Sequence, residues 1–166
     1  MAQSIPSDAI TVSVVNASPT SVATSGDTAL PVQFGLRFNV GQSDLTGVSA
    51  EIPLNWTPTP GNAPYADFTM DEPFFALDET KLPAVYDEET NPNSLISSYD
   101  ISADRLIIHL RDNMPTGQRD TGIFYVNLNT NYLNKIPTSV PLWTVTPEIW
   151  QEGTKVNTAT GVTFSA

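Results

Sequence analysis

The sequence has no cysteine and only one histidine, His109, among its 166 residues. Without cysteine there can be no disulfide framework, thiol nucleophile, cysteine-ligated zinc site or iron–sulfur cluster. His109 lies in the short apolar run 106–110, and no Gly-x-Ser-x-Gly pattern supplies a serine nucleophile for it. The glycine-rich phosphate-binding fingerprints do not occur either. We therefore expect a protein that is not an enzyme and that needs no organic cofactor.

Basic residues are also scarce, with 7 Lys+Arg against 18 Asp+Glu and a formal net charge of −11. Such a charge repels both a phosphate backbone and an anionic membrane surface. No apolar run approaches the length of a membrane-spanning helix, and residues 1–8 do not have the pattern of a signal peptide. We expect neither nucleic-acid binding nor membrane insertion. The composition favours a piece of a larger exported chain over an intracellular protein.

Strand patterns run through most of the sequence. Apolar and polar residues alternate most clearly over 31–40, and no window of eleven residues keeps a helical period without a break. The 14 prolines, together with glycine and Asx turns, punctuate the runs. The predicted strands are 10–14, 31–40, 48–56, 106–110, 121–128, 142–146 and 162–164. This pattern predicts an all-β fold, with residues 1–166 forming a single antiparallel β-sandwich of the immunoglobulin-like kind.

Most of the negative charge lies in one segment, residues 67–100, where nine acidic residues face the single basic residue Lys81. The strand alternation stops in the same segment. We therefore predict a long, irregular acidic insertion between core strands, which is where binding function is commonly found. The alternative is a solvated loop that only keeps the protein soluble.

Within this insertion, one short stretch has the spacing of a calcium loop. Asp87, Glu89, Asn91 and Asn93 offer side-chain oxygens at every second position, as ligands for a hard cation. The helix–loop–helix signature is incomplete, because Pro92 stands where a turn glycine is needed. Calcium is thus the one candidate ion, and an exposed Asx-rich turn is the alternative.

The tryptophans are the candidate ligand-binding residues. Trp56, Trp143 and Trp150 could form a platform for a carbohydrate or a peptide. The alternative is that these large rings fill the core and corners of the sandwich, where aromatic side chains contribute most to burial.

Two short patterns carry a family resemblance. Ser25-Gly26-Asp27-Thr28 is followed by the strand 34–40, and the turn 114–117 is followed by the strand 122–126. This arrangement resembles immunoglobulin-like modules of Gram-positive cell-surface proteins and adhesins, and cohesin modules share the Gly-Asp-Thr opening. The resemblance implies a β-sandwich at the cell surface, in the cell wall or outside the cell. It carries no functional residue over to this chain.

Together these observations predict a non-enzymatic structural or adhesive module of a bacterial extracellular or cell-surface protein. The absence of cysteine fits bacteria that export proteins without disulfides. Its partner would be a protein, a glycan or a neighbouring module of the same chain. Two alternatives stay open: a carbohydrate-binding or cellulosome-scaffold-type module, and a structural protein of a virion or other assembly.

Overall fold

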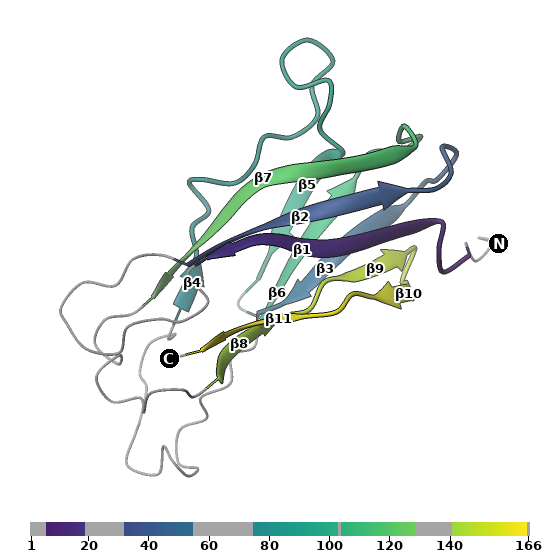
Figure 1. Ribbon diagram of the computed structural model, residues 1–166. Coiled ribbons are helices and arrows are strands. Elements are labelled where there is room, and N and C mark those ends of the chain that lie inside the picture. The colour runs from purple at the N-terminus through teal and green to yellow at the C-terminus, as the bar shows by residue number, and fades with distance from the viewer. Residues whose placement is uncertain (1–5, 19–31, 55–74, 103, 129–140, 166) are drawn as a thin grey trace, which may run out of the picture.

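The computed structural model describes residues 6–18, 32–54, 75–102, 104–128 and 141–165, and these form an all-β sandwich (Figure 1). Every strand pair is antiparallel. The first sheet has the order β1 (Ile10–Ser18), β2 (Val32–Val40), β7 (Gly117–Leu128), β4 (Phe75–Leu77). The second has the order β10 (Thr154–Thr158), β9 (Glu148–Gln151), β3 (Val48–Pro53), β6 (Arg105–Leu110), β5 (Ile96–Ile101). A separate pair joins β11 (Val162–Ser165) to β8 (Pro141–Val145).

The period-two alternation of the sequence explains how the layers face each other. In β3 and β6, buried residues alternate strictly with partly exposed ones, so one face of the sheet packs inward and the other faces solvent. The buried hydrophobic side chains of both sheets form one core cluster. The predicted all-β sandwich is therefore confirmed. Its immunoglobulin-like character stays a prediction.

Aromatic rings connect the first sheet to the β8–β11 pair. Phe34 on β2 stacks on Phe124 of β7 at 5.2 Å between ring centroids, and it makes a T-shaped contact with Trp143 of β8 at 5.7 Å between ring centroids. Trp143 in turn stacks on Phe164 of β11 at 5.9 Å. All four rings are at most 2 % exposed. Burial of such rings is a large part of the folding free energy of a sandwich.

Each predicted strand overlaps a strand of the structure, but four strands were not predicted. β4 and all but the last residue of β5 lie within residues 67–100, so the described part of that range, from residue 75 on, is not irregular throughout. A bulge in β5 between Ile96 and Ser98 breaks the alternation that would have revealed it. The other two, β9 and β10, form a hairpin whose two-residue turn has positive φ at Glu152 (48°) and Gly153 (87°).

The described residues contain no helix of the length and apolar character that would be needed to cross a membrane.

Candidate functional site: an acidic loop and a polar sheet face

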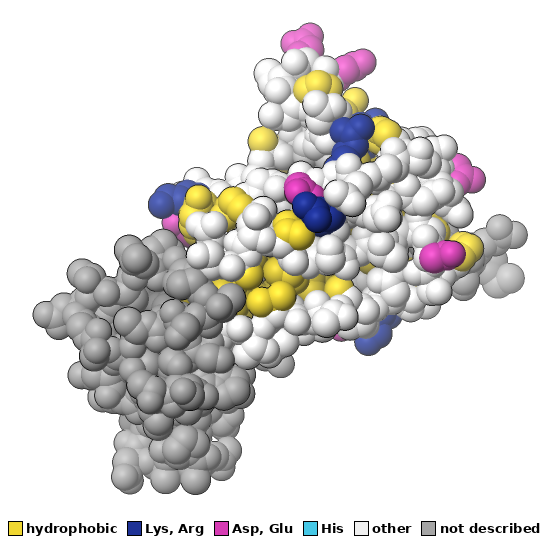
Figure 2. All heavy atoms as spheres, viewed as in Figure 1, with side chains coloured by type: hydrophobic (Ala, Val, Ile, Leu, Met, Phe, Trp, Pro, Cys, Tyr) yellow, Lys and Arg dark blue, Asp and Glu magenta, His cyan; other side chains and the backbone are white. Residues whose placement is uncertain are grey.

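The segment that joins β4 to β5, residues 78–95, is called the acidic loop here. It rises above the edge of β7 (Figure 1), and acidic side chains stand at its tip (Figure 2). The tip is a tight turn: the backbones of Asp87 and Asn91 hydrogen-bond to each other in both directions, at 3.2 and 2.9 Å. Asp87 Oδ1 also accepts the backbone amides of Glu89 and Thr90, at 2.8 and 3.0 Å. These amide donors lower the pKa of Asp87 below its ordinary value.

The side chain and backbone of Tyr86 hold one end of this turn. Its amide donates to the carbonyl of Ile96 at 2.6 Å, which ties the loop to the start of β5. The guanidinium of Arg111 lies over the Tyr86 ring, 3.9 Å from the ring centroid. A cation–π contact at this distance contributes about 0.5–1 kcal/mol at an exposed site. The loop is thus fixed to the body on the β5–β6 side.

Two further contacts hold the loop from within the sandwich. The Tyr99 hydroxyl donates to the Pro83 carbonyl at 2.6 Å, and burial raises the pKa of this phenol. Arg119 Nη1 on β7 donates to the Asn93 carbonyl at 3.0 Å and to its Oδ1 at 3.3 Å. The loop therefore bridges the two sheets at the open side of the sandwich. A loop anchored at several points loses less conformational entropy when it binds a partner.

The exposed glutamates of the acidic loop differ from the anchoring residues in having few partners. Glu79, Glu88 and Glu89 are exposed, and none of them takes part in an ion pair among the described residues. The only basic residue of the loop, Lys81, lies 3.9 Å from Asp78. The loop thus presents an uncompensated negative charge to the solvent.

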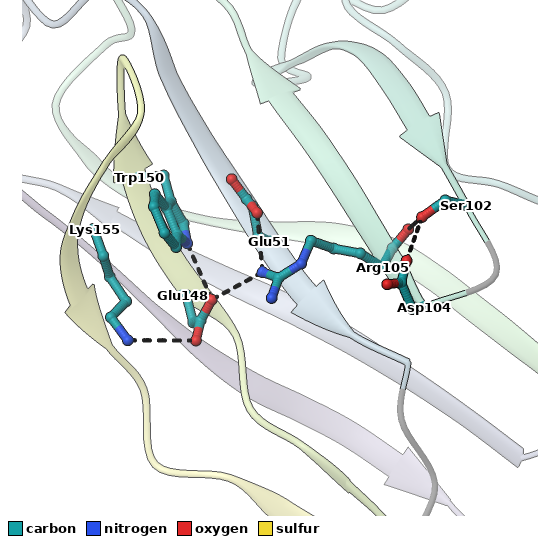
Figure 3. Close-up of polar contacts among 7 residues, drawn as sticks. All are labelled: Glu51, Ser102, Asp104, Arg105, Glu148, Trp150 and Lys155. Carbon is teal, nitrogen blue, oxygen red and sulfur yellow. Dashed lines mark hydrogen bonds and ion pairs between the residues drawn. The ribbon is translucent and has the colours of Figure 1, made fainter.

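The outer face of the second sheet is polar in a different way (Figure 3). Arg105 Nη1 on β6 lies 3.0 Å from Glu51 Oε1 on β3 and 3.1 Å from Glu148 Oε1 on β9. Glu51 and Glu148 face each other across the β3–β9 ladder, so their like charges would repel without this guanidinium. Both carboxylates are mostly buried, at 15 % and 14 % side-chain exposure. Arg105 therefore offsets one of the two negative charges in this group of three residues.

Trp150 and Lys155 extend this network along the β9–β10 hairpin. Trp150 Nε1 donates to Glu148 Oε1 at 3.0 Å, and Lys155 Nζ lies 3.7 Å from Glu148 Oε2. Partial burial alone would raise the pKa of Glu148. The hydrogen bonds from Trp150 and Arg105 and the charges of Lys155 and Arg105 outweigh it and lower that pKa below its ordinary value.

An open depression of about 610 Å³ lies on the same sheet face, lined in part by Ser49, Glu51, Asp100 and His109. His109 Nε2 lies 2.8 Å from Asp100 Oδ2. The Asp100 side chain is 73 % exposed, so water screens this pair strongly. The arrangement offers hydrogen-bonding groups to a ligand on a flat surface.

The three predicted tryptophans do not come together. Trp56 lies outside the described residues. Trp143 is 2 % exposed, and its Nε1 donates to the Pro53 carbonyl at 3.1 Å, so it fills the core, as the alternative proposed. Trp150 alone of the three lies at the described surface, on the outer face of β9.

The predicted calcium ligands all lie in the tip of the acidic loop. Asp87 Oδ1 is engaged by two backbone amides, and Asn93 Oδ1 accepts from Arg119. Within the described ranges, no three His, Cys, Asp or Glu side chains gather as a metal site would require. The Asx turn is the alternative that the sequence analysis named, and calcium binding stays a prediction.

Sequence reasoning missed the residues that hold these two surfaces, namely Arg105, Arg111, Arg119, Tyr86 and Tyr99. The sequence held one indication of these residues, because three of its four arginines lie within residues 101–119. These arginines follow an acidic segment, and a cluster of this kind indicates that the two segments pair in space. Which arginine pairs with which element depends on strand order, which the sequence does not state.

The chain was also compared with models of known protein families and with curated proteins. No family model matches it, and no curated protein is significantly similar to it in sequence.

Proposed function

We propose that this chain is a non-enzymatic adhesive or spacing module of a bacterial extracellular or cell-surface protein, with the acidic loop as its contact surface. The observation that carries the proposal is the contrast within the loop. Its base is fixed by Tyr86, Tyr99 and Asn93, whereas Glu88 and Glu89 at its tip are exposed. A rigid base that presents unpaired charges suits recognition, because little order is lost on binding.

The charge of the tip defines the chemistry of the partner. Exposed carboxylates favour a surface rich in Lys and Arg, and complementary charges speed association more than they tighten the final complex. Binding should therefore weaken as the salt concentration rises, since exposed charges are screened within about 8 Å at physiological ionic strength. A cationic protein, or a cationic neighbouring module of the same chain, fits this description.

The test uses an immobilised layer of poly-L-lysine and the full chain in biolayer interferometry. The variant with Glu88→Gln and Glu89→Gln loses two charges from the tip. At about 0.5 kcal/mol per exposed charge, the apparent affinity should fall about fivefold at low salt.

The matched control carries Asp8→Asn and Asp44→Asn, two exposed acids outside the loop. It loses the same net charge, so it reports the effect of overall charge alone. Equal losses of affinity in the control and the loop variant would contradict the proposal that the loop is the contact surface.

Trp150 supports a second candidate, a carbohydrate-binding module. Its indole is held by Glu148 on a flat sheet face, and Ser49 beside it lines the open depression. A fixed aromatic ring flanked by hydrogen-bonding groups is suited to a sugar ring. A glycan array with the wild type, Trp150→Ala and Trp150→Phe tests this: a signal that Phe keeps and Ala loses supports the candidate, and no signal from the wild type contradicts it.

The location outside the cell is supported by the cysteine-free composition and by the family resemblance in the sequence. Immunoblots of the supernatant, cell-wall and cytoplasmic fractions of the source organism test it, and a purely cytoplasmic signal would contradict it. Sedimentation of the purified chain as a large homo-oligomer would instead favour the alternative of an assembly protein.

A further inference from the structure

The outer edge of β7 is covered over only part of its length. The strand runs from Gly117 to Leu128, but β4 pairs only with residues 126–128. One more backbone bond, from Asp78 N to Tyr125 O at 2.8 Å, continues the pairing by a single residue. Among the described residues, no backbone hydrogen bond reaches the outer edge of residues 117–123. This stretch is called the free edge here.

The register shows which backbone groups point outward from the free edge. Gly41 N donates to Ala9 O, so the backbone N–H and C=O groups of Gly41 point toward β1. These groups point to opposite sides in successive residues of a strand, so those of the even-numbered residues of β2 point toward β7. In the β2–β7 register Phe38 faces Arg119, and these two exchange their backbone bonds. The N–H and C=O groups of Gln118 and Asp120, on either side of Arg119, therefore point away from β2 and are available to another strand.

A hollow of about 250 Å³ lies beside the free edge, between β7 and the acidic loop. Phe38, Leu95 and Ile96 form its buried apolar lining, and Ala84 lies on the loop side. The hollow has room for one apolar side chain. Arg119 lines it on the strand side.

Contacts between strand and loop bound this hollow. Arg119 bonds to Asn93, and Gly122 lies against Pro83 so closely that a Cβ on Gly122 would be 3.3 Å from the Pro83 Cβ. The loop thus contacts the strand through the side chain of Arg119 and through the backbone at Gly122, and the backbone stretch open to a partner is Gly117–Thr121. Such a stretch accommodates a short extended peptide.

We propose that an extended, cationic peptide segment adds to the free edge of β7 as a further strand and places one apolar side chain in the hollow beside Ala84. Backbone pairing with Gln118 and Asp120 gives such a peptide its register, and the hollow selects one side chain. The acids of the loop above the edge favour Lys and Arg at neighbouring positions. This proposal deepens the proposed function and rests on it for the charge of the partner.

Charge also selects among the possible occupants. A second copy of this chain carries a net charge of −11 and would meet an acidic loop of its own sign. At the edge itself, Asp120 is already paired with Arg37 at 2.7 Å, so it adds little net charge. Arg119, which lines the hollow, adds one positive charge, because its partner Asn93 is uncharged. The five acids of the loop, set against the single Lys81, outweigh it, so the loop attracts a cationic segment and repels another copy.

The probe is a fluorescein-labelled heptapeptide amide of sequence Lys-Val-Lys-Leu-Lys-Val-Lys, titrated with the full chain and followed by fluorescence anisotropy. A second peptide has the same sequence but carries N-methyl groups on alternate residues, which block strand pairing and keep the charge. We expect the unmethylated peptide to bind about tenfold more tightly, the equivalent of one or two net hydrogen bonds.

Two loop variants test the hollow. Ala84→Phe places a ring at the wall of the hollow, so that less room is left for a peptide side chain, and should weaken binding of the unmethylated peptide about tenfold. Val85→Phe adds the same ring at the neighbouring residue, which is 39 % exposed and does not line the hollow, and should not weaken it. Melting curves by circular dichroism check that both variants fold. Gln118→Pro, which removes an outward N–H without touching the bonds to β2, gives an independent measurement.

The outcomes separate this proposal from the function on which it rests. Equal affinity for both peptides, or unchanged binding by Ala84→Phe, overturns strand addition. If the variant with Glu88→Gln and Glu89→Gln still weakens binding in that case, the loop remains a contact surface. If Ala84→Phe abolishes binding and the loop variant has no effect, strand addition at the free edge is supported, and the proposal that the loop charges attract the partner is wrong. No binding of either peptide overturns both.

Discussion

The acidic loop and the outer face of the second sheet both carry several charged residues, but they use them differently. On the sheet face, Glu51 and Glu148 are mostly buried and share one guanidinium, that of Arg105. At the loop tip, Glu88 and Glu89 are exposed and take part in no ion pair within the described part of the chain. Paired, half-buried charges contribute to the fold. Unpaired, exposed charges contribute little to stability and are available to a partner.

Removing Arg105 should have the largest effect on stability, because it leaves two mostly buried carboxylates facing each other. Arg105→Met should lower the free energy of unfolding by about 2 kcal/mol, less than a fully buried pair would cost, since the guanidinium is one-third exposed. Urea unfolding followed by fluorescence measures this. Arg37→Met, which breaks the exposed pair with Asp120, is the matched control and should leave the midpoint unchanged. Equal effects of the two variants would show that the ion pairs of the sheet face stabilise the fold no more than an exposed ion pair does.

The Glu148 carboxylate makes the same network sensitive to acid. Its pKa is lowered in the folded state from the ordinary value of 4.5, so its contribution to stability is present above about pH 4.5 and is lost as the pH falls through the folded value. Urea midpoints measured between pH 6 and pH 3 should fall less steeply for Glu148→Gln than for the wild type. Parallel slopes would contradict the role of this residue.

Asp87 should affect the loop tip alone. Asp87→Ala removes the acceptor for the amides of Glu89 and Thr90, so hydrogen exchange at these two amides should become several-fold faster, while exchange in β6 stays unchanged. NMR exchange measurements on the full chain report both regions at once. Asp87→Asn keeps an acceptor oxygen and should show a smaller change. Faster exchange in β6 would mean that the tip and the sheets unfold together.

Neutralising the tip should have the smallest effect on stability. Glu88→Gln with Glu89→Gln should change the free energy of unfolding by less than about 0.5 kcal/mol, as surface substitutions without partners usually do. Urea unfolding beside the Arg105→Met series gives the comparison directly. A loss as large as that of Arg105→Met would mean that these acids stabilise the fold and are not reserved for a partner.

Much of the fold could be predicted from the sequence, because strands with one buried face alternate visibly. The clear alternation of residues 31–40 corresponds to β2, whose Phe34 and Phe38 are fully buried. The strand β5 could not be seen, since Ser97 and Ser98 occupy its bulge and leave no apolar period. The β9–β10 hairpin was missed as well, because its turn is Glu-Gly and lacks the usual Asn-Gly or Asp-Gly signal.

The candidate surfaces could be predicted only in part. The acidic segment could be found, because the charge of any stretch is obtained by counting its acidic and basic residues. The anchors of the loop could not be found, since Arg119 and Arg111 lie about 25 residues from the tip in sequence and meet it only through strand order. Nothing in the sequence told the buried Trp143 from the surface Trp150, because both lie in short runs of similar composition.

An NMR titration of the ¹⁵N-labelled full chain with the Lys-Val-Lys-Leu-Lys-Val-Lys peptide shows directly which surface binds a cationic segment. Chemical shifts should change in the acidic loop and along residues 117–121 of β7, while the amides of Glu51, Arg105 and Glu148 stay unperturbed. Shifts confined to the outer face of the second sheet, with none in the acidic loop, would contradict this prediction.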